Sequence, residues 1–257
     1  MCMRAMRVSR RRFLLAIAAS ALGFTAVGAV NGVSLTMTRL DFGLGRRVLF
    51  LPDIHVHRSG ERDYVVRVAE KLGPDIVIIG GDLWDERTHN MSVVRMLVEG
   101  LRRNARVVIA ILGNHEYWNT SKFPLREAIA GLENLGVMVL RDEVVDGAGL
   151  RVAGLDWRDN PRDYEEALQG LGGADVFVSH SPDAFPYLGK HGASLLAGHT
   201  HGGQVCLPGS ISIATNSVYG YRWGLYRLRG NVMYVSRGLG EMYPPRLYCS
   251  REAVLVT

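Results

Sequence analysis

The stretch DIVIIGGD, residues 75–82, decides the fold class that this sequence specifies. Its four consecutive β-branched residues, Ile76 to Ile79, do not alternate with polar residues, which is typical of a strand buried on both faces of a parallel sheet. The sequence therefore predicts buried strands here and in five further apolar runs that each end at a polar residue: RVLFLPD (47–53), RVVIAILGN (106–114), RVAGLD (151–156), DVFVSH (175–180) and SLLAGH (194–199).

Helical patterns separate the early apolar runs. Apolar residues recur at helical spacing over residues 64–72, where a Gly-Pro pair ends the pattern, and a second helical stretch runs from Pro124 to Gly136. Strands that alternate with helices in this way predict an α/β domain. After Gln204 the helical spacing is lost, so we expect the tail to form several strands of a second, more antiparallel sheet.

The size and charge of the chain fit one domain with a short N-terminal appendage. The 257 residues are 47% hydrophobic, so residues 31–257 can bury a sizeable core. Of the 30 Lys and Arg residues, five lie in residues 1–30, which leaves 25 against the 25 acidic residues of the remaining chain. Because the body is neutral, we expect no avid binding of duplex nucleic acid. The sequence does not determine the oligomeric state.

Residues 1–30 have the layout of an export signal. A basic flank, SRRRFLL (9–15), precedes AIAASALGFTAVGAV (16–30), an apolar run broken only by small residues and hydroxyl groups. The segment is either cleaved or kept as a membrane anchor. Arg10 and Arg11, followed after one residue by Phe and Leu, resemble the twin-arginine motif, which implies the twin-arginine translocase as a partner; an ordinary signal anchor is the alternative. In both cases we expect the body outside the cytoplasm, in the cell envelope.

The polar residues that follow the strands offer oxygen and imidazole donors. Ligands of open α/β sheets collect outside the carboxyl ends of the strands, so these side chains should converge in one crevice. Such donors suit Mn, Fe or Zn, and their number exceeds what one ion can use, which predicts two divalent metal ions. The residues are Asp53 and His55, Asp82 and Asp85, Asn114, His115 and Glu116, His180, and His199 and His201.

The stretch GHTHGGQ (198–204) is the most specific of these motifs. If the chain is extended there, His199 and His201 point to the same side while Thr200 points away, so each histidine can reach a different metal ion. The flanking glycines let the backbone turn sharply and pass close to the ions.

Some histidines and cysteines fit no motif. We expect His57, His89 and His191 at the surface or in packing positions. Cys206 and Cys249 are too few for a disulfide framework, so they either form one bridge or remain two buried thiols.

The series DIH (53–55), GDLWD (81–85), GNHE (113–116), SH (179–180) and GHTH (198–201) resembles the calcineurin-like metallophosphoesterase superfamily. The extended GHTHGGQ, with SRGLG (236–240) and the closing RLYCSREAVLVT, resembles its YkuE/YaeI-like bacterial branch. The resemblance covers nearly all of residues 31–257. It implies a four-layer α/β/β/α sandwich of two mixed sheets.

The resemblance also implies a role for each site residue. Asp53, His55, Asp82 and His201 would hold one metal ion, and Asp82, Asn114, His180 and His199 the other, with Asp82 bridging. His115 would lie beside the leaving-group oxygen as a general acid. Asp85 and Glu116 would fix the orientation of the ligands and of His115. The family usually has Gly where this chain has His57, so the entrance beside that ion is either narrowed or given an extra donor.

The implied reaction is hydrolysis of a phosphoester by metal-activated hydroxide. We expect phosphodiesters, among them envelope or lipid-linked molecules, as substrates. One alternative is cleavage of the pyrophosphate of a UDP-linked acylated glucosamine, a cytoplasmic reaction that conflicts with export. Another is a metal-containing envelope-binding protein with negligible catalysis, associated with the membrane or the cell wall.

Overall fold

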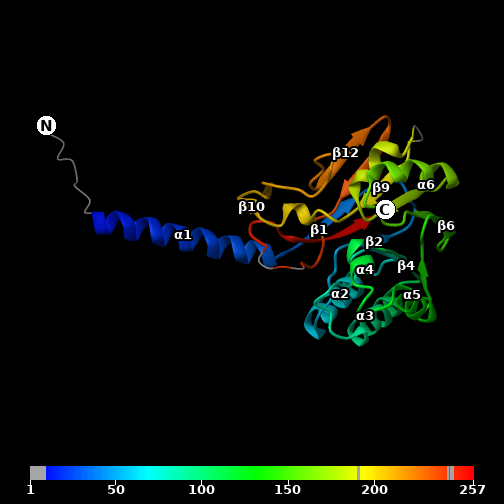
Figure 1. The fold of residues 1–257 in the computed structure, drawn as a ribbon, viewed down its shortest axis with the longest axis horizontal. Helices are drawn as coiled ribbons and strands as arrows, with labels where there is room; N and C mark the ends of the chain where they lie inside the picture. The colour runs from blue at the N-terminus through cyan, green and yellow to red at the C-terminus, as the bar shows by residue number, and fades with distance from the viewer. Residues whose placement is uncertain (1–9, 190–191, 242, 244–245) are drawn as a thin grey trace.

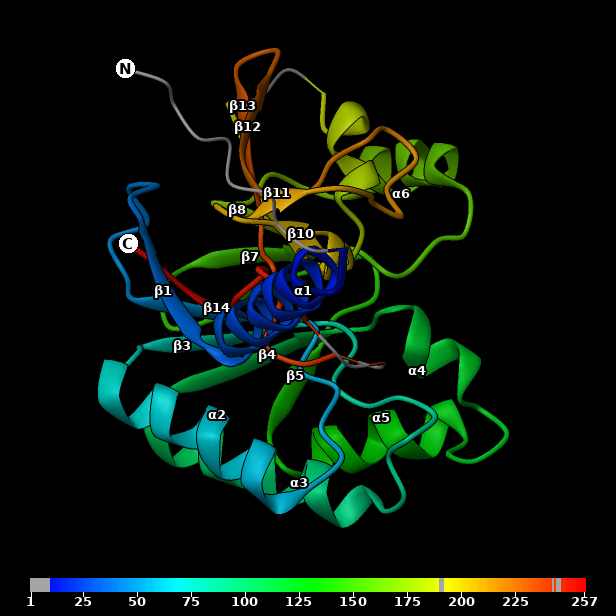
Figure 2. The ribbon, with the colours of Figure 1, turned by 90° about the vertical axis from the view of Figure 1, so that its left-hand side faces the viewer.

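The computed structural model of the protein describes residues 10–189, 192–241, 243 and 246–257. Two six-stranded mixed sheets lie face to face, with helices on their outer sides and a long N-terminal helix that projects from the body (Figure 1). Figure 2 shows α2, α3 and α5 on one outer side and α6 on the other. The implied four-layer sandwich is confirmed. The elements are α1 (Arg10–Val33), β1 (Leu35–Leu40), β2 (Val48–Leu51), α2 (Ser59–Leu72), β3 (Ile76–Gly80), α3 (Met91–Asn104), β4 (Val107–Ile111), α4 (Asn114–Trp118), α5 (Leu125–Asn134), β5 (Val137–Val139), β6 (Glu143–Asp146), β7 (Arg151–Gly154), η1 (Pro161–Asp163), α6 (Tyr164–Gly170), β8 (Val176–Ser179), η2 (Pro182–Tyr187), β9 (Ser194–Ala197), η3 (His201–Gly203), β10 (Cys206–Leu207), β11 (Ile211–Ser212), β12 (Gly224–Leu228), β13 (Asn231–Val235) and β14 (Arg251–Val256).

The first sheet has the strand order β1-β14-β2-β3-β4-β5. The run that decides the fold class is β3, which is buried over its whole length and pairs in parallel with β2 and β4. All six predicted apolar runs are strands. Between them, α2 ends at Gly73 in the left-handed conformation, and α5 begins directly after Pro124, as the sequence predicts.

The second sheet has the order β12-β13-β9-β8-β7-β6. The prediction that the tail builds this sheet is only partly right. β12 and β13 extend it from β9, to which β13 is parallel, but β14 crosses to the first sheet and lies between β1 and β2. The physical reason is burial: Val254 and Val256 of β14 complete the apolar layer between the two sheets.

Apolar layers between the two sheets and on their outer faces hold the sandwich together. The layer between the sheets includes Phe50, Ile78, Ile109 and Val178, all buried. A second layer packs α2, α3 and α5 against the outer face of the first sheet. Ligands of α/β sheets bind outside the carboxyl ends of the parallel strands, so the loops at that edge of the sandwich are the place to look for a site.

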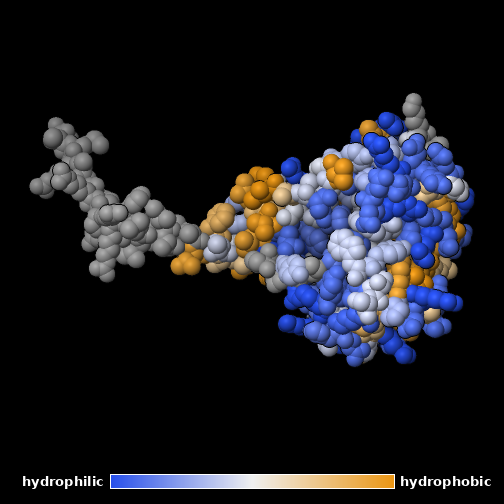
Figure 3. All heavy atoms as spheres, viewed as in Figure 1, coloured by the Kyte–Doolittle hydropathy of each residue, from blue (hydrophilic) through white to orange (hydrophobic). Residues whose placement is uncertain are grey.

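Helix α1 continues the predicted N-terminal segment to Val33 and meets the body near its end. Residues 1–9, and with them the start of the basic flank, lie outside the described residues. Within the described part of the chain, no helix is long and apolar enough to cross a membrane. The apolar surface at the junction of α1 and the body is visible in Figure 3. Cys206 and Cys249 are two buried thiols.

Candidate metal centre

The loops after β2, β3 and β4 meet the loops after β8 and β9 at one edge of the sandwich. They bring together two groups of side chains whose ligand atoms lie within 4.8 Å of one another. Asp82 belongs to both groups, as expected of a bridging carboxylate. The groups are Asp53, His55, Asp82 and His201, and Asp82, His180 and His199.

The first group has the spacing of ligands that share an ion. Nε2 of His55 lies 3.7 Å from Oδ2 of Asp82, and Nε2 of His201 lies 3.7 Å from Oδ1 of Asp53. These separations are too long for hydrogen bonds but suit two ligands that are each about 2.0–2.2 Å from one ion. Nε2 of His55 is buried and has no hydrogen-bond partner among the described residues, so a cation there would satisfy it.

The second group is closer. Nε2 of His180 lies 3.2 Å from Oδ2 of Asp82 and 3.3 Å from Nδ1 of His199. Nδ1 of His180 donates to the carbonyl oxygen of Gly80 at 2.8 Å, which turns Nε2 toward Asp82. Oδ1 of Asn114 is a second buried atom without a hydrogen-bond partner among the described residues. The donor set therefore fits a pair of divalent ions.

Most of the proposed ligands have a strained backbone conformation. Five of the proposed ligands have positive φ angles, from 45° at His55 to 70° at His199: Asp53, His55, Asp82, His199 and His201. Residues other than glycine rarely adopt this conformation, and it clusters at functional sites.

The backbone angles show that the extended geometry predicted for residues 198–204 is wrong. The stretch is a turn and not an extended segment, because Thr200 has helical angles (φ −81°, ψ −13°) between two left-handed histidines. The ligand atoms of His199 and His201 lie beside Asp82 for that reason, and not because of strand alternation. Gly198 allows the close approach, since a Cβ atom there would lie 2.6 Å from Oδ2 of Asp53.

The buried carboxylate of Asp82 is stabilised in its charged form by positive charge nearby. Burial acts to raise the pKa of Asp82, but the charges of His180 and His55 outweigh it and hold that pKa below its usual range. Burial likewise acts to lower the pKa of His180, and the charge and hydrogen bond of Asp82 overcome it, raising the pKa to about 10. Burial, and then the charge of His180, lower the pKa of His199 to about 3, so His199 stays neutral and able to bind a cation.

Asp85 lies between two histidines. Its Oδ2 is 2.9 Å from Nδ1 of His55, which leaves Nε2 of His55 toward Asp82. Its Oδ1 is 2.8 Å from Nε2 of His57. This corrects the prediction that His57 is a surface or packing residue: it is mostly buried and orients the carboxylate that orients His55. His89 is exposed as predicted, and His191 lies outside the described residues.

Glu116 holds the loop of Asp82, although it was predicted to orient His115 as well. Its carboxylate accepts hydrogen bonds from the backbone amides of Asp82, Leu83 and Gly113 at 2.7–2.9 Å. Burial and the charge of Asp82 raise the pKa of Glu116 to about 7. The hydrogen bonds of Glu116 to backbone amides join the loops after β3 and β4.

His115 is oriented by Glu86 instead. Oε2 of Glu86 lies 2.9 Å from Nδ1 of His115, and the backbone amide of His115 donates to Oδ1 of Asp82 at 3.0 Å. Glu86 was not predicted from the sequence. The sequence feature that could have identified Glu86 is an acidic residue directly after GDLWD, in the same loop.

A pocket of about 210 Å³ opens above the two groups. Asp82, Asn114, His199 and His201 line it on the metal side, and His115 lines its wall. Four further lining residues were not predicted as site residues: Trp118, Asn216 and Tyr243, which belong to no motif, and Gln204, the last residue of GHTHGGQ. Trp118 and Tyr243 are exposed aromatic side chains.

The ligands are also contacted by Asn216 and by two further residues that were not predicted as site residues, Trp157 and Arg246. The ring of Trp157 lies 5.0 Å from that of His199, and the side-chain amide of Asn216 lies 3.0 Å from Nε2 of His199. The guanidinium group of Arg246 is buried beside Nδ1 of His201, at 3.1 Å, and also donates to the carbonyl oxygen of Gly240 at 2.6 Å.

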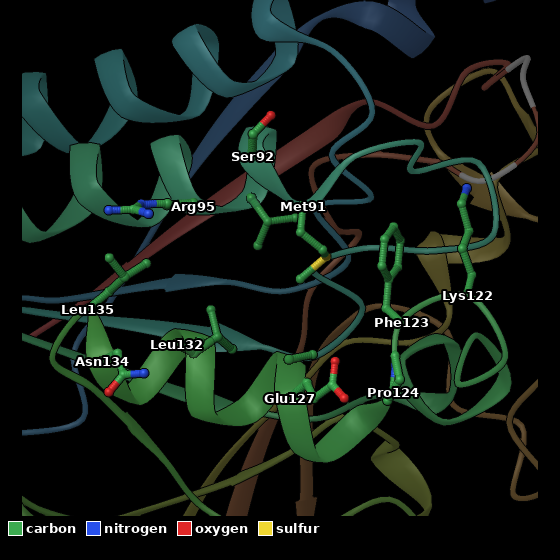
Figure 4. Close-up of a pocket in the computed structure, with 13 residues that line it drawn as sticks. Met91, Ser92, Arg95, Lys122, Phe123, Pro124, Glu127, Leu132, Asn134 and Leu135 are labelled. Atoms are coloured by element: carbon green, nitrogen blue, oxygen red, sulfur yellow. The ribbon is translucent and has the colours of Figure 1, made fainter.

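A larger cavity, of about 620 Å³, lies between α3 and α5. Met91, Phe123 and Leu132 are among the residues that line it (Figure 4). None of its lining residues belongs to the metal groups, so it is separate from the metal centre.

Comparisons with known proteins agree with this geometry. The profile of the calcineurin-like phosphoesterases matches residues 46–204. The chain is 28% identical over 243 residues to an uncharacterized metallophosphoesterase of Aquifex aeolicus, covering 89% of this chain and 90% of that protein. It is 30% identical over 207 residues to the uncharacterized metallophosphoesterase YkuE of Bacillus subtilis, covering 75% of this chain and 70% of YkuE.

Other similarities are more distant or cover less of the relative. A Helicobacter pylori metallophosphoesterase is 28% identical over 208 residues, and this chain spans about half of its length, 54%. The phosphopantetheinyl hydrolase of Mycobacterium tuberculosis superposes with a TM-score of 0.46 at 15% identity, over 75% of this chain and 89% of that one. By its match to the family profile and to YkuE, the chain belongs to the calcineurin-like phosphoesterase family of metal-dependent phosphoester hydrolases, in its YkuE-like branch.

Proposed function

We propose that this protein hydrolyses phosphodiesters in preference to phosphomonoesters. The observation that carries the proposal is the charge of the pocket above the metal groups, whose described lining residues include no Lys or Arg. A phosphomonoester carries about two negative charges near pH 7, because its second pKa is about 6, whereas a diester carries one. Two divalent ions whose charge is partly offset by the Asp53 and Asp82 carboxylates would match the single charge of a diester, whereas the second charge of a monoester would meet no Lys or Arg in the described lining.

The residues of the pocket would have distinct roles in the reaction. The two ligand groups would hold a pair of divalent ions, which when bound would neutralise phosphate oxygens and lower the pKa of a water molecule. His115 reaches the pocket wall with Nδ1 held by Glu86, so Nε2 is the ring nitrogen that can give a proton to the departing alcohol. Trp118 and Tyr243 offer exposed rings to the apolar part of a substrate.

The proposal is tested by assaying the full chain on matched chromogenic substrates. The protein is stripped of metal, resupplied with Mn or Zn, and given a diester and a monoester with the same leaving group. We expect turnover that depends on metal, with kcat/KM higher for the diester. A preference for the monoester would refute the charge argument. Bound metal without turnover of either substrate would instead favour a binding protein.

We further propose that the body acts in the cell envelope, on lipid-linked or other envelope diesters. The proposal is supported by the basic-then-apolar layout of residues 1–30, and by the apolar side chains that α1 exposes next to the body. Fusions of residues 1–35 to an export reporter, with Arg10 and Arg11 kept or changed to Lys, test the route. Loss of export in the Lys pair supports the twin-arginine translocase, and unchanged export points to the general pathway.

Removing the metal ions should destabilise the fold as well as abolish turnover. Ligands that bind only the folded state stabilise it by mass action, by about 2.7 kcal/mol when present at about 100 times Kd. For a domain of this size that corresponds to a fall in Tm of about 5–10 °C on chelation. Differential scanning fluorimetry with and without chelator measures it, and Mn or Zn should restore the original Tm. An unchanged Tm would mean that the Asp and His groups hold no ion.

Changing Glu86 to Gln should slow the reaction without removing metal. Glu86 contacts His115 and none of the proposed ligands, so we expect kcat to fall by about tenfold, at the low end of such orienting contacts, while KM and metal content stay the same. Glu165→Gln, at an exposed position of α6, is the matched control. A loss of metal in Glu86→Gln would show that Glu86 acts through the ligands and not through His115.

A further inference from the structure

An exposed apolar surface lies beside the metal centre, on residues 205–219. This segment comprises the β10–β11 hairpin and the loop toward β12, and we call it the apolar hairpin. Six of its large apolar side chains are 43–70% exposed: Val205, Leu207, Ile211, Ile213, Val218 and Tyr219. Soluble proteins rarely expose contiguous apolar surface without a partner for it.

The apolar hairpin also lacks charge. From Gly202 to Tyr221 the sequence GGQVCLPGSISIATNSVYGY contains no Asp, Glu, Lys, Arg or His, although 21% of the whole chain is charged, so about four such residues would be expected. The segment is nevertheless ordered. Cys206 and Leu207 pair with Ser212 and Ile211, and the indole of Trp223 donates to the carbonyl oxygen of Ser210 at 3.0 Å. These contacts order a segment that exposes apolar side chains and carries no charge.

One short segment ties the apolar hairpin to helix α1. The backbone amide of Cys206 donates to the carbonyl oxygen of Leu247 at 2.8 Å. The next residue, Tyr248, donates from its hydroxyl to the carbonyl oxygen of Phe24 at 2.8 Å and packs its ring 4.8 Å from that of Phe24. Figure 2 shows β10 and β11 directly beside α1. The two apolar surfaces are thus held in a fixed relation on one side of the body.

The exposed apolar residues of α1 are not confined to one stripe. Within its described side chains they are Leu22, Phe24, Val27, Val30 and Val33. At 3.6 residues per turn they are spread over about 200° of the helix circumference. A groove in a partner protein covers one stripe of a helix, whereas lipid surrounds it, so this distribution favours a bilayer.

We propose that the apolar hairpin inserts into the interface of a lipid bilayer, alongside α1, as a second contact that orients the metal pocket toward the membrane. It would lie in the plane of the headgroups and does not span the membrane. Arg222, exposed directly after the uncharged stretch, is placed to meet anionic headgroups. The proposal deepens the envelope function proposed above, on which its lipid-linked substrate class rests.

The position of the apolar hairpin explains how insertion would serve the reaction. A Cβ atom on Gly203 would lie 2.5 Å from the carbonyl oxygen of Ala214, so the segment packs against the turn that carries His201. Asn216, in the same segment, contacts His199 and lines the pocket. A diester in a lipid headgroup could therefore reach the metal centre while its acyl chains stay in the bilayer.

The proposal is tested by locating the apolar hairpin directly in membrane-bound full-length protein. In a Cys2→Ser background, an environment-sensitive dye is attached at Ile211→Cys, and the protein is reconstituted into phosphatidylcholine and phosphatidylglycerol vesicles. Cys206 and Cys249 are buried and should not react. We expect a blue-shifted emission that nitroxide-labelled lipids quench, because interfacial segments lie about 5–10 Å into the boundary of headgroups and acyl chains. The dye at Glu133→Cys, an exposed position of α5, should remain in water.

A functional arm uses the double variant Ile211→Ser/Ile213→Ser. Both side chains are exposed, so the fold and the turnover of a soluble chromogenic diester should not change. Turnover of a diester lipid in vesicles should fall by about tenfold or more, since two apolar side chains would no longer enter the interface.

The outcomes separate this proposal from the proposed reaction. Quenching at position 211 without any diester turnover would support membrane insertion and refute the reaction. Turnover of soluble diester without quenching would overturn the insertion and leave the reaction standing. A blue shift that grows with protein concentration and is insensitive to nitroxide lipids would also overturn it, because a second copy of the chain would then cover the surface.

Discussion

Asp82→Ala is expected to lose metal and activity together. Asp82 is the carboxylate shared by both ligand groups, 3.2 Å from His180 and 3.7 Å from His55, and it also accepts the backbone amide of His115. Without the Asp82 carboxylate, both ligand groups lose the ligand that they share. Metal ions supply several kcal/mol of transition-state stabilisation, so kcat/KM should fall by about 10³-fold or more. Elemental analysis of the purified protein, beside the diester assay, measures both losses.

The control for this variant is Asp146→Ala, which removes an exposed carboxylate of β6. It should keep both metal content and kcat/KM. Asp82→Ala should have a Tm close to that of chelated wild-type protein, which distinguishes loss of metal from unfolding. If Asp82→Ala retained two equivalents of metal, Asp82 would not bridge the ions.

His115→Ala is expected to separate metal binding from turnover. His115 lines the pocket, and its ring belongs to neither metal group, so metal content should stay at the wild-type level. Loss of a general acid should lower kcat by about 10²- to 10⁴-fold. The loss should be smaller for a diester whose leaving alcohol has a low pKa, because such a leaving group needs less protonation.

The matched control is His89→Ala, an exposed histidine outside the site. It should behave as wild type in both assays. Full turnover of His115→Ala on a poor leaving group would contradict the general-acid role. A loss of metal from it would instead place His115 among the ligands.

Six buried strands and their order along the chain could be predicted, but β1, β5 and β6 were not, nor were all of the strand neighbours. A buried apolar run such as residues 75–82 specifies a central strand by local composition. The partner of β14 depends on contacts between distant residues: Val254 pairs with Phe50, and Leu35 pairs with Arg251. No local pattern in the tail indicates that pairing, which is why the tail was expected to belong to the second sheet alone.

The candidate site was predictable where chemistry follows a strand end. Asp53, Asp82 and His180 each stand directly after an apolar run, and the structure brings them together. Glu86, Asn216 and Arg246 carry no such signal, because their roles arise from loops that meet only in the folded chain. His57 shows the same limit, since its contact with Asp85 depends on how the loops after β2 and β3 pack.

The sequence by itself determined the fold class, the kinds of ligand atoms and the strand ends at which they stand, because burial and donor chemistry are properties of the residues. Only the tertiary structure decided how those atoms converge. Five proposed ligands adopt positive φ angles, a conformation that costs about 1 kcal/mol or more at each residue. Local preference opposes that conformation. It persists because two packed sheets, Glu116 and the close approach at Gly198 together hold the loops in place.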